Sequence, residues 1–366
     1  MRIVHLSTVH HDWDNRIVNK ECRALVEAGF DVHLVISADE DRVTHGVTVH
    51  AIKRRSRARR LVGSQWEGWR KLVELKPDLL HIHDPELLPL AVAYGRRRRV
   101  PVIYDAHEDL VKQLGTKPWL NRHTERVVNP LARTLLGLAD RSCAAVVTAT
   151  DDIAANFSTR RGGRARPVVT VRNLPWRRDF TVADVAANPR VAVYTGDLTE
   201  ERGLSLMVDS VAAVPEARLL LAGRRLVPAA DLENDVVDYR GLVPPSDLPG
   251  IIASARVGLI FLKRLPNYEN SIPTKVFEYM ASGVPFLATD FPAWKRLFGG
   301  CEGGVFVDTD DPEAVVQALT ALLDDPERCA ALGRKGREAV EREFSFEAEA
   351  PKLVELVRSL LAAAAD

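Results

Sequence analysis

The sequence predicts an α/β protein with two domains, each built on a parallel sheet. Short apolar runs alternate with helix-length periodic segments along the chain, which is the pattern of strands joined by crossover helices. The chain has 366 residues, more than the roughly 250–300 that a single core usually supports. A polar, proline-bounded segment near the middle indicates a linker. We therefore expect domains over residues 1–172 and 190–345, a linker over 173–189, and a separate terminal helix over 346–366.

The candidate strands are short runs rich in Val, Ile and Leu, each followed by enough chain for a helix. In the first half they lie at Arg2–Ser7, Val32–Ser37, Val47–Ala51, Leu79–His83, Val102–Asp105, Ala144–Ala149 and Val168–Val171. In the second half they lie at Val191–Thr195, Ala217–Ala222, Val237–Tyr239, Val257–Phe261, Phe286–Ala288 and Val305–Val307. The remainder is predicted to be helical from Pro312 to Glu343 and again from Glu347 to Ala362.

Composition is that of an ordinary globular protein. The chain is 46% hydrophobic and 27% charged, and no stretch approaches the ~18 apolar residues that a membrane span requires. No signal-peptide cleavage pattern follows the amino end, so we expect a cytoplasmic protein. The cysteines are far apart and have apolar neighbours, which predicts reduced, buried thiols.

The charge is unevenly distributed although the net charge is zero. Residues 1–180 carry 31 Lys and Arg against 21 Asp and Glu, whereas the remainder carries 19 against 29. The basic residues gather in Lys53–Arg60, Arg96–Arg99 and Arg160–Arg166. Such runs fit a domain that faces an anionic surface or substrate, and they also fit solvated loops.

The first half lacks a glycine-rich turn after its first strand. A dinucleotide-binding domain needs such a turn for the cofactor pyrophosphate, and no glycine occurs before Gly29. This argues against an oxidoreductase. The turn is instead HHDWDNR, rich in hydrogen-bonding side chains, which suits a hydroxyl-rich acceptor. The pair His10 and His11 with Asp12 and Asp14 could ligate a metal, but no third ligand and second shell are legible, and we expect no metal.

Two further strand ends of the first half are polar. The runs HIHDPE (His81–Glu86) and YDAHED (Tyr104–Asp109) follow apolar strands, at the sheet edge where open α/β folds bind ligands. A single histidine there is more often structural, but this clustering favours a functional site. His107 is the preferred member, since an imidazole can donate to a sugar hydroxyl or to an anionic leaving group at neutral pH.

The second half does contain a candidate phosphate cradle. The turn GDLTEERG, from Gly196 to Gly203, follows a strand and opens a helix near Leu204, where amides and the positive helix end favour an anion. Arg202 could pair with a diphosphate through two hydrogen bonds. The alternative is a surface arginine paired with Glu200 or Glu201.

A second helix start lies in the segment 267–290. Ser271 or Thr274 is predicted to cap this helix and Pro273 to occupy its first turn, so that the amides of residues 271–274 point outward. Lys275 lies in the first turn, where a cation is unfavourable unless an anion is bound. Glu278 follows one turn later, where it could accept hydrogen bonds from a ribose diol. A salt bridge between these two side chains is the alternative.

These motifs together resemble family 4 glycosyltransferases, the retaining, metal-independent group with the GT-B fold. The resemblance covers nearly the whole chain through HIHDPELLP, YDAHED, YTGDLTEERG and PTKVFEYMASGVPFLATDFP. It implies two facing Rossmann-like domains, with the acceptor bound by the first, the nucleotide-sugar by the second, and the terminal helix crossing back to the first.

The residues and the resemblance together give a list of expected site residues. We expect catalytic contributions from His107, Arg202 and Lys275. Donor contacts are expected from Gly196, Gly203, Asn270, Ser271, Ile272, Pro273, Thr274 and Glu278. Acceptor contacts are expected from Asp14, Arg16, His83, Asp84 and Asp109. No cofactor is expected beside a UDP- or GDP-sugar as co-substrate.

Two positions differ from the usual family pattern. The family commonly has a pair of glutamates separated by seven residues, and Asn270 stands in place of the first. The usual arginine after the first glycine of the turn is Asp197 here, which removes a phosphate cation that Lys275 could replace. The triplet Asp308–Asp310 spells a manganese motif of other glycosyltransferases, but Asp310 or Asp311 is better explained as a helix cap.

The resemblance implies transfer of a sugar with retention, in cell-surface polysaccharide or glycoconjugate synthesis. The alternatives are a soluble small-molecule or secondary-metabolite acceptor, an epimerase acting on a nucleotide-sugar, and a noncatalytic subunit that binds a nucleotide-sugar. The expected partners are the donor and a sugar or lipid-linked acceptor, with no nucleic acid. The basic first domain suggests peripheral contact with an anionic membrane at its cytoplasmic face.

Overall fold

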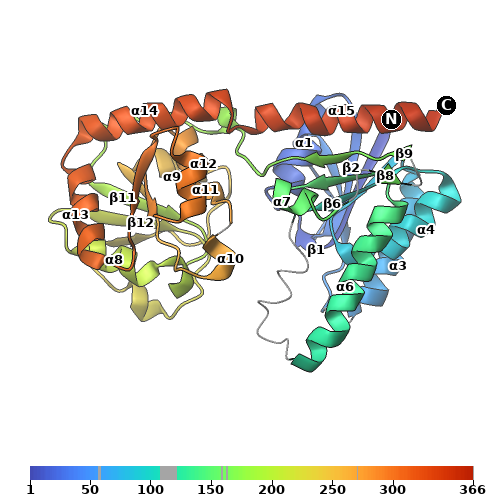
Figure 1. Cartoon of the computed structure of the whole chain (residues 1–366), viewed down its shortest axis with the longest axis horizontal. Coiled ribbons are helices and arrows are strands. Elements are labelled where there is room, and N and C mark those ends of the chain that lie inside the picture. Colours follow the sequence, from blue (N-terminus) through green and yellow to red (C-terminus); the bar gives the residue numbers. More distant parts are fainter. Residues whose placement is uncertain (57–58, 108–121, 158–159, 162–163, 270, 366) are drawn as a thin grey trace. The chain divides into compact units, whose positions relative to one another are not determined.

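The computed structural model describes residues 1–56, 59–107, 122–157, 160–161, 164–269 and 271–365. The chain divides into two compact units, Met1–Asn173 with Ala348–Asp366, and Leu174–Glu347 (Figure 1). Each unit is an α/β body with its own core. The terminal segment from residue 348 thus belongs to the first unit. The residues predicted as a linker from 174 onward belong to the second unit, because Leu174 and Val185 are buried in its core.

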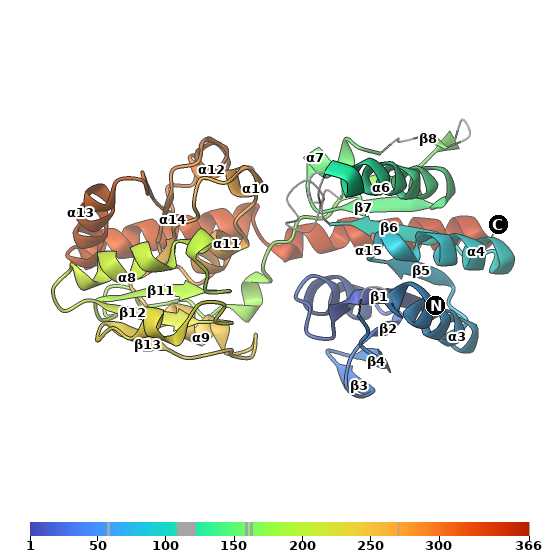
Figure 2. The same cartoon turned by 90° about the horizontal axis from the view of Figure 1, so that it is seen from below.

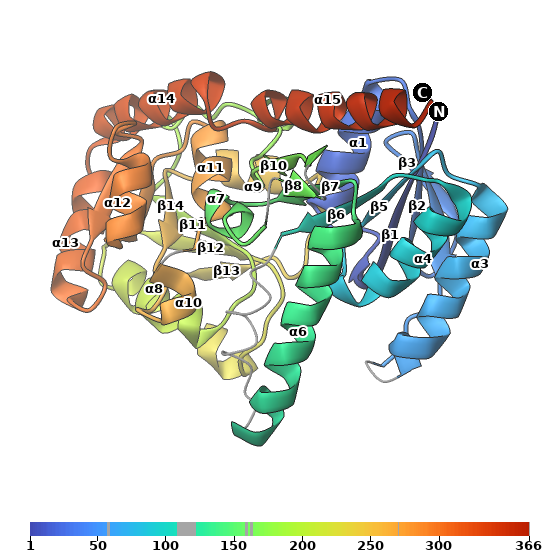
Figure 3. The ribbon, with the colours of Figure 1, turned by 45° about the vertical axis from the view of Figure 1, so that its right-hand side comes forward.

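The first unit is built on one eight-stranded sheet, ordered β10-β7-β6-β5-β1-β2-β4-β3. Every pairing is parallel except that of β3 with β4. The strands are β1 (Arg2–His11), β2 (Asp31–Ser37), β3 (Arg42–Thr44), β4 (Val47–Ile52), β5 (Leu79–Ile82), β6 (Val102–Ala106), β7 (Ala145–Thr148) and β10 (Val168–Thr170). Neighbouring strands β5, β1 and β2 can be followed in Figure 3.

The helical segments of the first unit are η1 (Ile17–Cys22), α1 (Arg23–Glu27), η2 (Arg60–Ser64), α3 (Gln65–Leu75), η3 (Pro85–Leu87), α4 (Leu88–Arg98), α6 (Arg122–Ser142), α7 (Asp151–Ala154) and α15 (Phe346–Ala365). Alternate side chains of a strand point to opposite faces of a sheet. Val4 and Leu6 of β1 therefore share a face, and they pack in one apolar cluster with Leu72 of α3 and Leu88 of α4. His5, which lies between the two apolar residues, points to the other face.

The second unit has a six-stranded, fully parallel sheet ordered β13-β12-β11-β14-β15-β16. Strands β13, β12 and β11 lie side by side in Figure 2. The strands are β11 (Val191–Thr195), β12 (Arg218–Ala222), β13 (Val237–Tyr239), β14 (Val257–Ile260), β15 (Phe286–Thr289) and β16 (Gly304–Val307). The helical segments are η4 (Arg177–Asp179), η5 (Glu200–Arg202), α8 (Leu204–Ala212), η6 (Ala229–Leu232), α9 (Leu248–Ala253), α10 (Pro266–Glu269), α11 (Thr274–Ala281), α12 (Pro292–Phe298), α13 (Pro312–Leu323) and α14 (Pro326–Arg342).

Two local predictions are corrected by the structure. The short strand β3 was not expected, because its residues carry no apolar alternation and pair with β4 through the turn at His45 and Gly46, both at positive φ. The helix predicted from Pro312 to Glu343 is two helices. Asp325 accepts a hydrogen bond from the amide of Arg328 at 2.9 Å and so caps the start of α14.

The cysteine prediction is confirmed for all four residues. Each thiol is buried and none forms a disulfide. They are Cys22, Cys143, Cys301 and Cys329.

Candidate active site

In both sheets, successive strands are added toward one edge and then, from a single point in the sheet, toward the other edge. In the first unit this point lies between β1 and β5, and in the second between β11 and β14. Open α/β sheets bind ligands outside the carboxyl ends of the strands at such a point. The carboxyl end of β1 with the residues after it is 8–14, the segment after β5 is 83–86, and the segment after β11 is 196–203. Of the predicted site residues, Asp14, His83, Asp84, Gly196, Arg202 and Gly203 lie in these segments.

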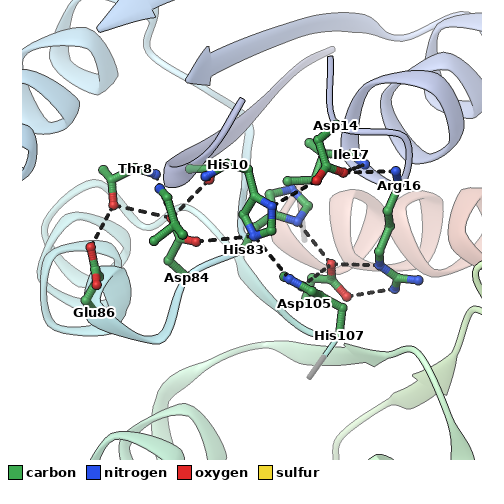
Figure 4. A network of polar contacts seen from close by, with 12 residues as sticks. Thr8, His10, Asp14, Arg16, Ile17, His83, Asp84, Glu86, Asp105 and His107 are labelled. Carbon is green, nitrogen blue, oxygen red and sulfur yellow. Dashed lines mark hydrogen bonds and ion pairs between the residues drawn. The ribbon is translucent and has the colours of Figure 1, made fainter. Parts of the chain in front are cut away.

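Asp105, at the end of β6, is the centre of the polar network in the first unit (Figure 4). The guanidinium of Arg16 donates to both of its carboxylate oxygens, at 3.1 and 2.8 Å. His83 Nδ1 lies 3.0 Å from Oδ2, and His107 Nδ1 lies 3.2 Å from the same oxygen. Burial alone would raise the pKa of Asp105, but Arg16 and the two imidazoles outweigh burial and hold it well below its usual range. Asp105 is therefore a charged anchor for two histidines.

His10 and His107 form the outer part of this network. Their Nε2 atoms are 3.1 Å apart, and His10 Nδ1 lies 2.9 Å from Asp14 Oδ2. Burial lowers the pKa of His10, but the hydrogen bond to Asp14 and the charge of Asp84 outweigh it and raise the pKa above 6.5. Asp14 has its pKa lowered to about 2, since the contact with His10 outweighs burial. His10 in its charged form can donate to His107, leaving the Nδ1 hydrogen of His107 to face Asp105.

Asp84 stabilises the turn that carries His10. Its Oδ2 accepts from the amide of Thr8 at 2.6 Å, the hydroxyl of Ser7 at 3.0 Å and the amide of Val9 at 3.2 Å. A carboxylate with this many donors is held in one orientation. The strand β1 and the segment after β5 are therefore joined by a fixed polar contact.

Burial revises the predicted role of three acceptor residues. Arg16, His83 and Asp84 are 6%, 1% and 2% exposed, and their polar atoms are bonded within the first unit. We therefore correct their assignment from acceptor contact to support of His10 and His107. Among these side chains, His10, His107 and Asp14 retain exposed surface. His10 was missed as a site residue in the sequence, although an acid four positions later at Asp14 was a usable signal.

The second unit brings two cations to the end of β11. Lys275, on α11, lies directly over Gly196, because a Cβ atom on that glycine would meet its Cε at 2.4 Å and its Nζ at 2.9 Å. The Lys275 ammonium is 5.9 Å from the ring centre of Tyr194. Arg202 approaches the hydroxyl of the same tyrosine at 3.5 Å. Tyr194 therefore lies between the two cations at the edge of the sheet.

Neither cation forms an ion pair with an acid among the described residues, although the charge of Asp197 acts on both and that of Glu278 acts on Lys275. Within the described residues, Arg202 forms no ion pair with Glu200 or Glu201, and Lys275 forms none with Glu278. The salt-bridge alternatives from the sequence are therefore not formed. Burial is the main reason that the pKa of Lys275 is lowered, and the neighbouring Arg202 lowers it further. Two partly buried cations of like charge at one strand end form a site suited to an anion.

Glycine is required at two positions of this turn. Gly196 has φ +138° and Gly203 has φ +77°, both in the range that side chains disfavour. A Cβ atom at Gly203 would lie 2.1 Å from the carbonyl oxygen of Phe261. The turn therefore packs its backbone against β14 and leaves its outer side to Arg202.

The start of α11 differs from its prediction. Pro273 occupies the cap position and no side chain caps the helix, because Ser271 Oγ donates instead to the carbonyl of Tyr268 at 2.9 Å. The amide of Ser271 also donates to Tyr268, and proline has no amide hydrogen, which removes two of the four predicted outward donors. Ile272, Thr274 and Glu278 are partly exposed. Asn270 and Asp109 lie outside the described residues, so their predicted contacts stay predictions.

The unusual Asp197 is paired with a cation from the neighbouring strand end. Arg224, just after β12, donates to its two oxygens at 3.2 and 2.9 Å. Burial raises the pKa of Asp197, but this contact outweighs it and the pKa is lowered. An arginine is thus present at this edge, although it is supplied by a different strand from the one expected.

The acidic triplet is tied to an arginine. Arg264 contacts Asp290, Asp308 and Asp310 at 2.6, 2.8 and 2.8 Å. Asp311 caps α13 by accepting from the amide of Ala314 at 3.1 Å, as one of the two predicted alternatives. The triplet therefore has structural partners for its carboxylates.

Comparisons with known proteins agree with this fold. Residues 15–174 match the family described as a glycosyl transferase 4-like domain, and residues 201–355 match the family described as glycosyl transferase-like. Sucrose-phosphate synthase from Thermosynechococcus elongatus has a similar structure, with a TM-score of 0.74 over 99% of both chains at 17% identity. The chain belongs to the family 4-like glycosyltransferases of the GT-B fold.

Other proteins similar to this glycosyltransferase match part of the chain in sequence or the whole chain in fold. It is 28% identical over 177 residues to the lipopolysaccharide core biosynthesis mannosyltransferase LpsB of Rhizobium meliloti, covering 45% of this chain and 50% of that protein. The chain spans about half the length of this curated relative. A phosphatidyl-myo-inositol mannosyltransferase of Mycobacterium leprae matches 77% of this chain and 73% of its own length at 25% identity. HepE of Anabaena in complex with UDP-glucose has a TM-score of 0.71 at 15% identity, covering 98% of this chain and 100% of that one.

Among the described residues of the glycosyltransferase, none of the helices is long and apolar enough to cross a bilayer.

Proposed function

We propose that this protein transfers a sugar from a UDP- or GDP-sugar to an acceptor hydroxyl, with retention at the anomeric carbon, in the synthesis of a cell-surface polysaccharide or glycoconjugate. The observation that carries the proposal is the pair Arg202 and Lys275, of which Lys275 lies over Gly196 and Arg202 contacts the hydroxyl of Tyr194, with neither cation in an ion pair within 4.0 Å among the described residues. The named activities of the mannosyltransferase relatives support the reaction class.

The chemistry requires stabilisation of a departing diphosphate. As the bond from the anomeric carbon to the phosphate oxygen breaks, negative charge grows on the leaving group, and cations fixed in a partly dry site stabilise it without reorganisation. The acceptor oxygen forms its bond from the same face, and its proton passes to the departing phosphate. In this scheme Arg202 and Lys275 supply the positive charge, and neither a protein nucleophile nor a metal ion is needed.

The first unit would bind the acceptor. His10 and His107 present imidazole nitrogens at the carboxyl edge of the sheet, held by Asp14 and Asp105. Their two Nε2 atoms contact each other in the free protein, and a sugar hydroxyl that replaces this contact would be oriented by accepting from one ring and donating to the other. Glu278 of α11 retains exposed carboxylate for a ribose diol in the second unit.

An acceptor at an anionic membrane fits the surface of η2 and α3. Leu61, Val62 and Trp66 are 56%, 76% and 63% exposed, an unusual concentration of large apolar side chains. Exposed Arg59 and Arg70 lie on the same segments. Apolar anchors flanked by arginine are the pattern of segments that lie in the lipid headgroup region. We therefore place peripheral membrane contact on this surface, which we call the η2–α3 patch (residues 59–70).

The donor assignment is tested by Arg202→Ala and Lys275→Ala. Each variant should lose about 2–4 kcal/mol of transition-state stabilisation, or roughly 30- to 1000-fold in kcat/KM, because each removes a cation from the growing charge. The measurement is sugar transfer with a panel of UDP- and GDP-sugars.

Arg264→Ala provides the matched control. This arginine is also near a strand end but is engaged by three carboxylates, so its loss should leave the rate within a few-fold. Wild-type turnover in both cation variants would refute the proposed donor site.

A further inference from the structure

Three histidines occupy one face of the first sheet, opposite the apolar face packed by α3 and α4. His5 on β1 and His81 on β5 are register partners in adjacent parallel strands. His83 follows two positions after His81, and successive alternate residues share a face. Their ring centres are 4.6, 4.8 and 5.2 Å apart. The sheet therefore fixes three imidazoles as neighbours, independently of the residues around them.

Several polar atoms of this cluster form no hydrogen bond although they are fully buried. His5 and His81 are 0% exposed, and so is Glu21 on η1, which covers this face. His5 Nε2, both nitrogens of His81 and both oxygens of Glu21 form no hydrogen bond. Buried polar groups in native proteins are almost always satisfied. Several unsatisfied atoms in one place indicate a ligand that could contact one atom from each of these residues.

The arrangement supplies the donor set of a metal site, and a tetrahedral ion with bonds of about 2.0–2.1 Å would draw the four ligand atoms closer together. One ligand atom from each of His5, Glu21, His81 and His83 can be chosen so that all four lie within 4.8 Å of one another. Three imidazoles and one carboxylate are a ligand set that zinc accepts, with two histidines at alternate positions of one strand and a third on its neighbour.

The surrounding residues orient these ligands. His83 Nδ1 lies 3.0 Å from Asp105, which fixes its hydrogen on that nitrogen, so that Nε2 accepts from His5 Nδ1 at 2.9 Å. Metal binding would replace this hydrogen bond by a bond from Nε2 to the ion. Arg16 lies 3.0 Å from one oxygen of Glu21 and holds that carboxylate in place. Metal-bound histidines and carboxylates are commonly held by such outer contacts.

We propose that His5, Glu21, His81 and His83 bind one divalent zinc ion as a structural site. Four protein ligands close the coordination shell, so the ion has no open position for water and is distinct from the sugar-transfer chemistry. The inference does not depend on the proposed function, because it concerns residues buried within the first unit. The competing explanation is a cluster of neutral histidines that binds no metal.

The test is the metal content of the tag-free full chain purified in the presence of zinc and then desalted. We expect about one zinc per chain, a melting temperature that rises on adding zinc to chelator-treated protein, and a visible spectrum typical of tetrahedral coordination when cobalt replaces zinc. Wild-type protein that retains no zinc and shows no rise in melting temperature would overturn the site.

Two variants locate the ion. Glu21→Gln and His81→Gln should weaken zinc binding by about 100-fold or more, since even changes to outer contacts cost about 10–100-fold. His50→Gln is the control, because His50 also contacts a histidine, His33, at 2.8 Å but lies outside the cluster. Zinc retained at full strength by both cluster variants would show adventitious binding. Should either fail to fold, the wild-type cobalt spectrum still decides between metal and neutral histidines.

Discussion

At the scale of single residues, the first unit contains buried charged side chains, and each is stabilised by an oppositely charged partner. Asp105 remains charged because Arg16 donates to both its oxygens, and a buried carboxylate without such a partner would be protonated instead. The charged form of His10 is stabilised in the same way, because Asp14 lies near its Nδ1 and Asp84 near its Nε2. These contacts make the stability of the first unit dependent on pH.

The sign of that dependence follows from the raised pKa of His10. Its charged form is favoured by folding, so its contribution is fully present below the unfolded value near 6.5 and is lost as pH rises through the higher folded value. The stability difference between the wild type and His10→Gln should therefore shrink as the solution is made alkaline. Thermal unfolding of both proteins across this range measures it.

His50→Gln should show the opposite trend. Burial lowers the pKa of His50, and the charge of His33 lowers it further. Its neutral form is therefore favoured by folding, and its contribution is lost as pH falls through the unfolded value. If the stability difference between the wild type and His10→Gln grew as the pH was raised, the raised pKa assigned to His10 would be contradicted.

At the scale of elements, η2 and α3 combine features that a helix exposed only to water does not need. Arg55 is paired with Glu67 and Arg60 with Glu86, so the basic run is partly neutralised within the unit. Arg54 and Arg59 are exposed on the same run, beside the exposed apolar residues of the η2–α3 patch. The paired Arg55 and Arg60 therefore support the structure of the unit. The exposed Arg54 and Arg59 remain available to a lipid surface.

The patch predicts binding to anionic vesicles. Trp66→Ala should lower the affinity for phosphatidylserine vesicles by roughly tenfold, because a large ring leaves the headgroup region. The affinity of the wild type should also fall as salt is raised. Vesicle co-sedimentation measures both effects.

Trp13→Ala is a control of the same residue type. Trp13 is also exposed, at 56%, but it lies against His11 in the turn after β1. Equal losses in both variants, or binding without salt dependence, would argue for a soluble acceptor instead.

At the scale of the whole molecule, the chain returns to its first unit after completing the second. Glu349 of α15 is fully buried and accepts from the amide and the side chain of Arg172, at 3.1 and 2.8 Å. Lys352 adds a third contact at 2.8 Å. The terminal helix is thus fastened where the first unit ends.

Glu349→Ala should destabilise the first unit selectively. The loss should be on the order of 2 kcal/mol, below the roughly 3–5 typical of a buried pair, because the Arg172 side chain is 32% exposed. Hydrogen exchange should rise within residues 1–173 and remain unchanged within 174–347. The control is Glu355→Ala, an exposed acid on the same helix. Equal exchange in both units would contradict this assignment.

The sequence by itself determined the fold class, most strand positions and the cations of the second unit. Strands of a parallel sheet that is buried on both faces have nearly continuous apolar sequences. The positions of β11 and β14 could therefore be predicted from the sequence alone. The turn bounded by Gly196 and Gly203 could also be predicted, because a tight turn between a strand and a helix often needs glycine at positions of positive φ.

Only the tertiary structure decided which polar side chains are exposed. Arg16, His83 and Asp84 look like ligand contacts in the sequence, yet they are buried and bonded to partners far along the chain. Burial and partner choice depend on strand order, which the local sequence does not encode. The same reason explains why Arg224 opposite Asp197 and the histidine cluster around His81 emerged only from the fold.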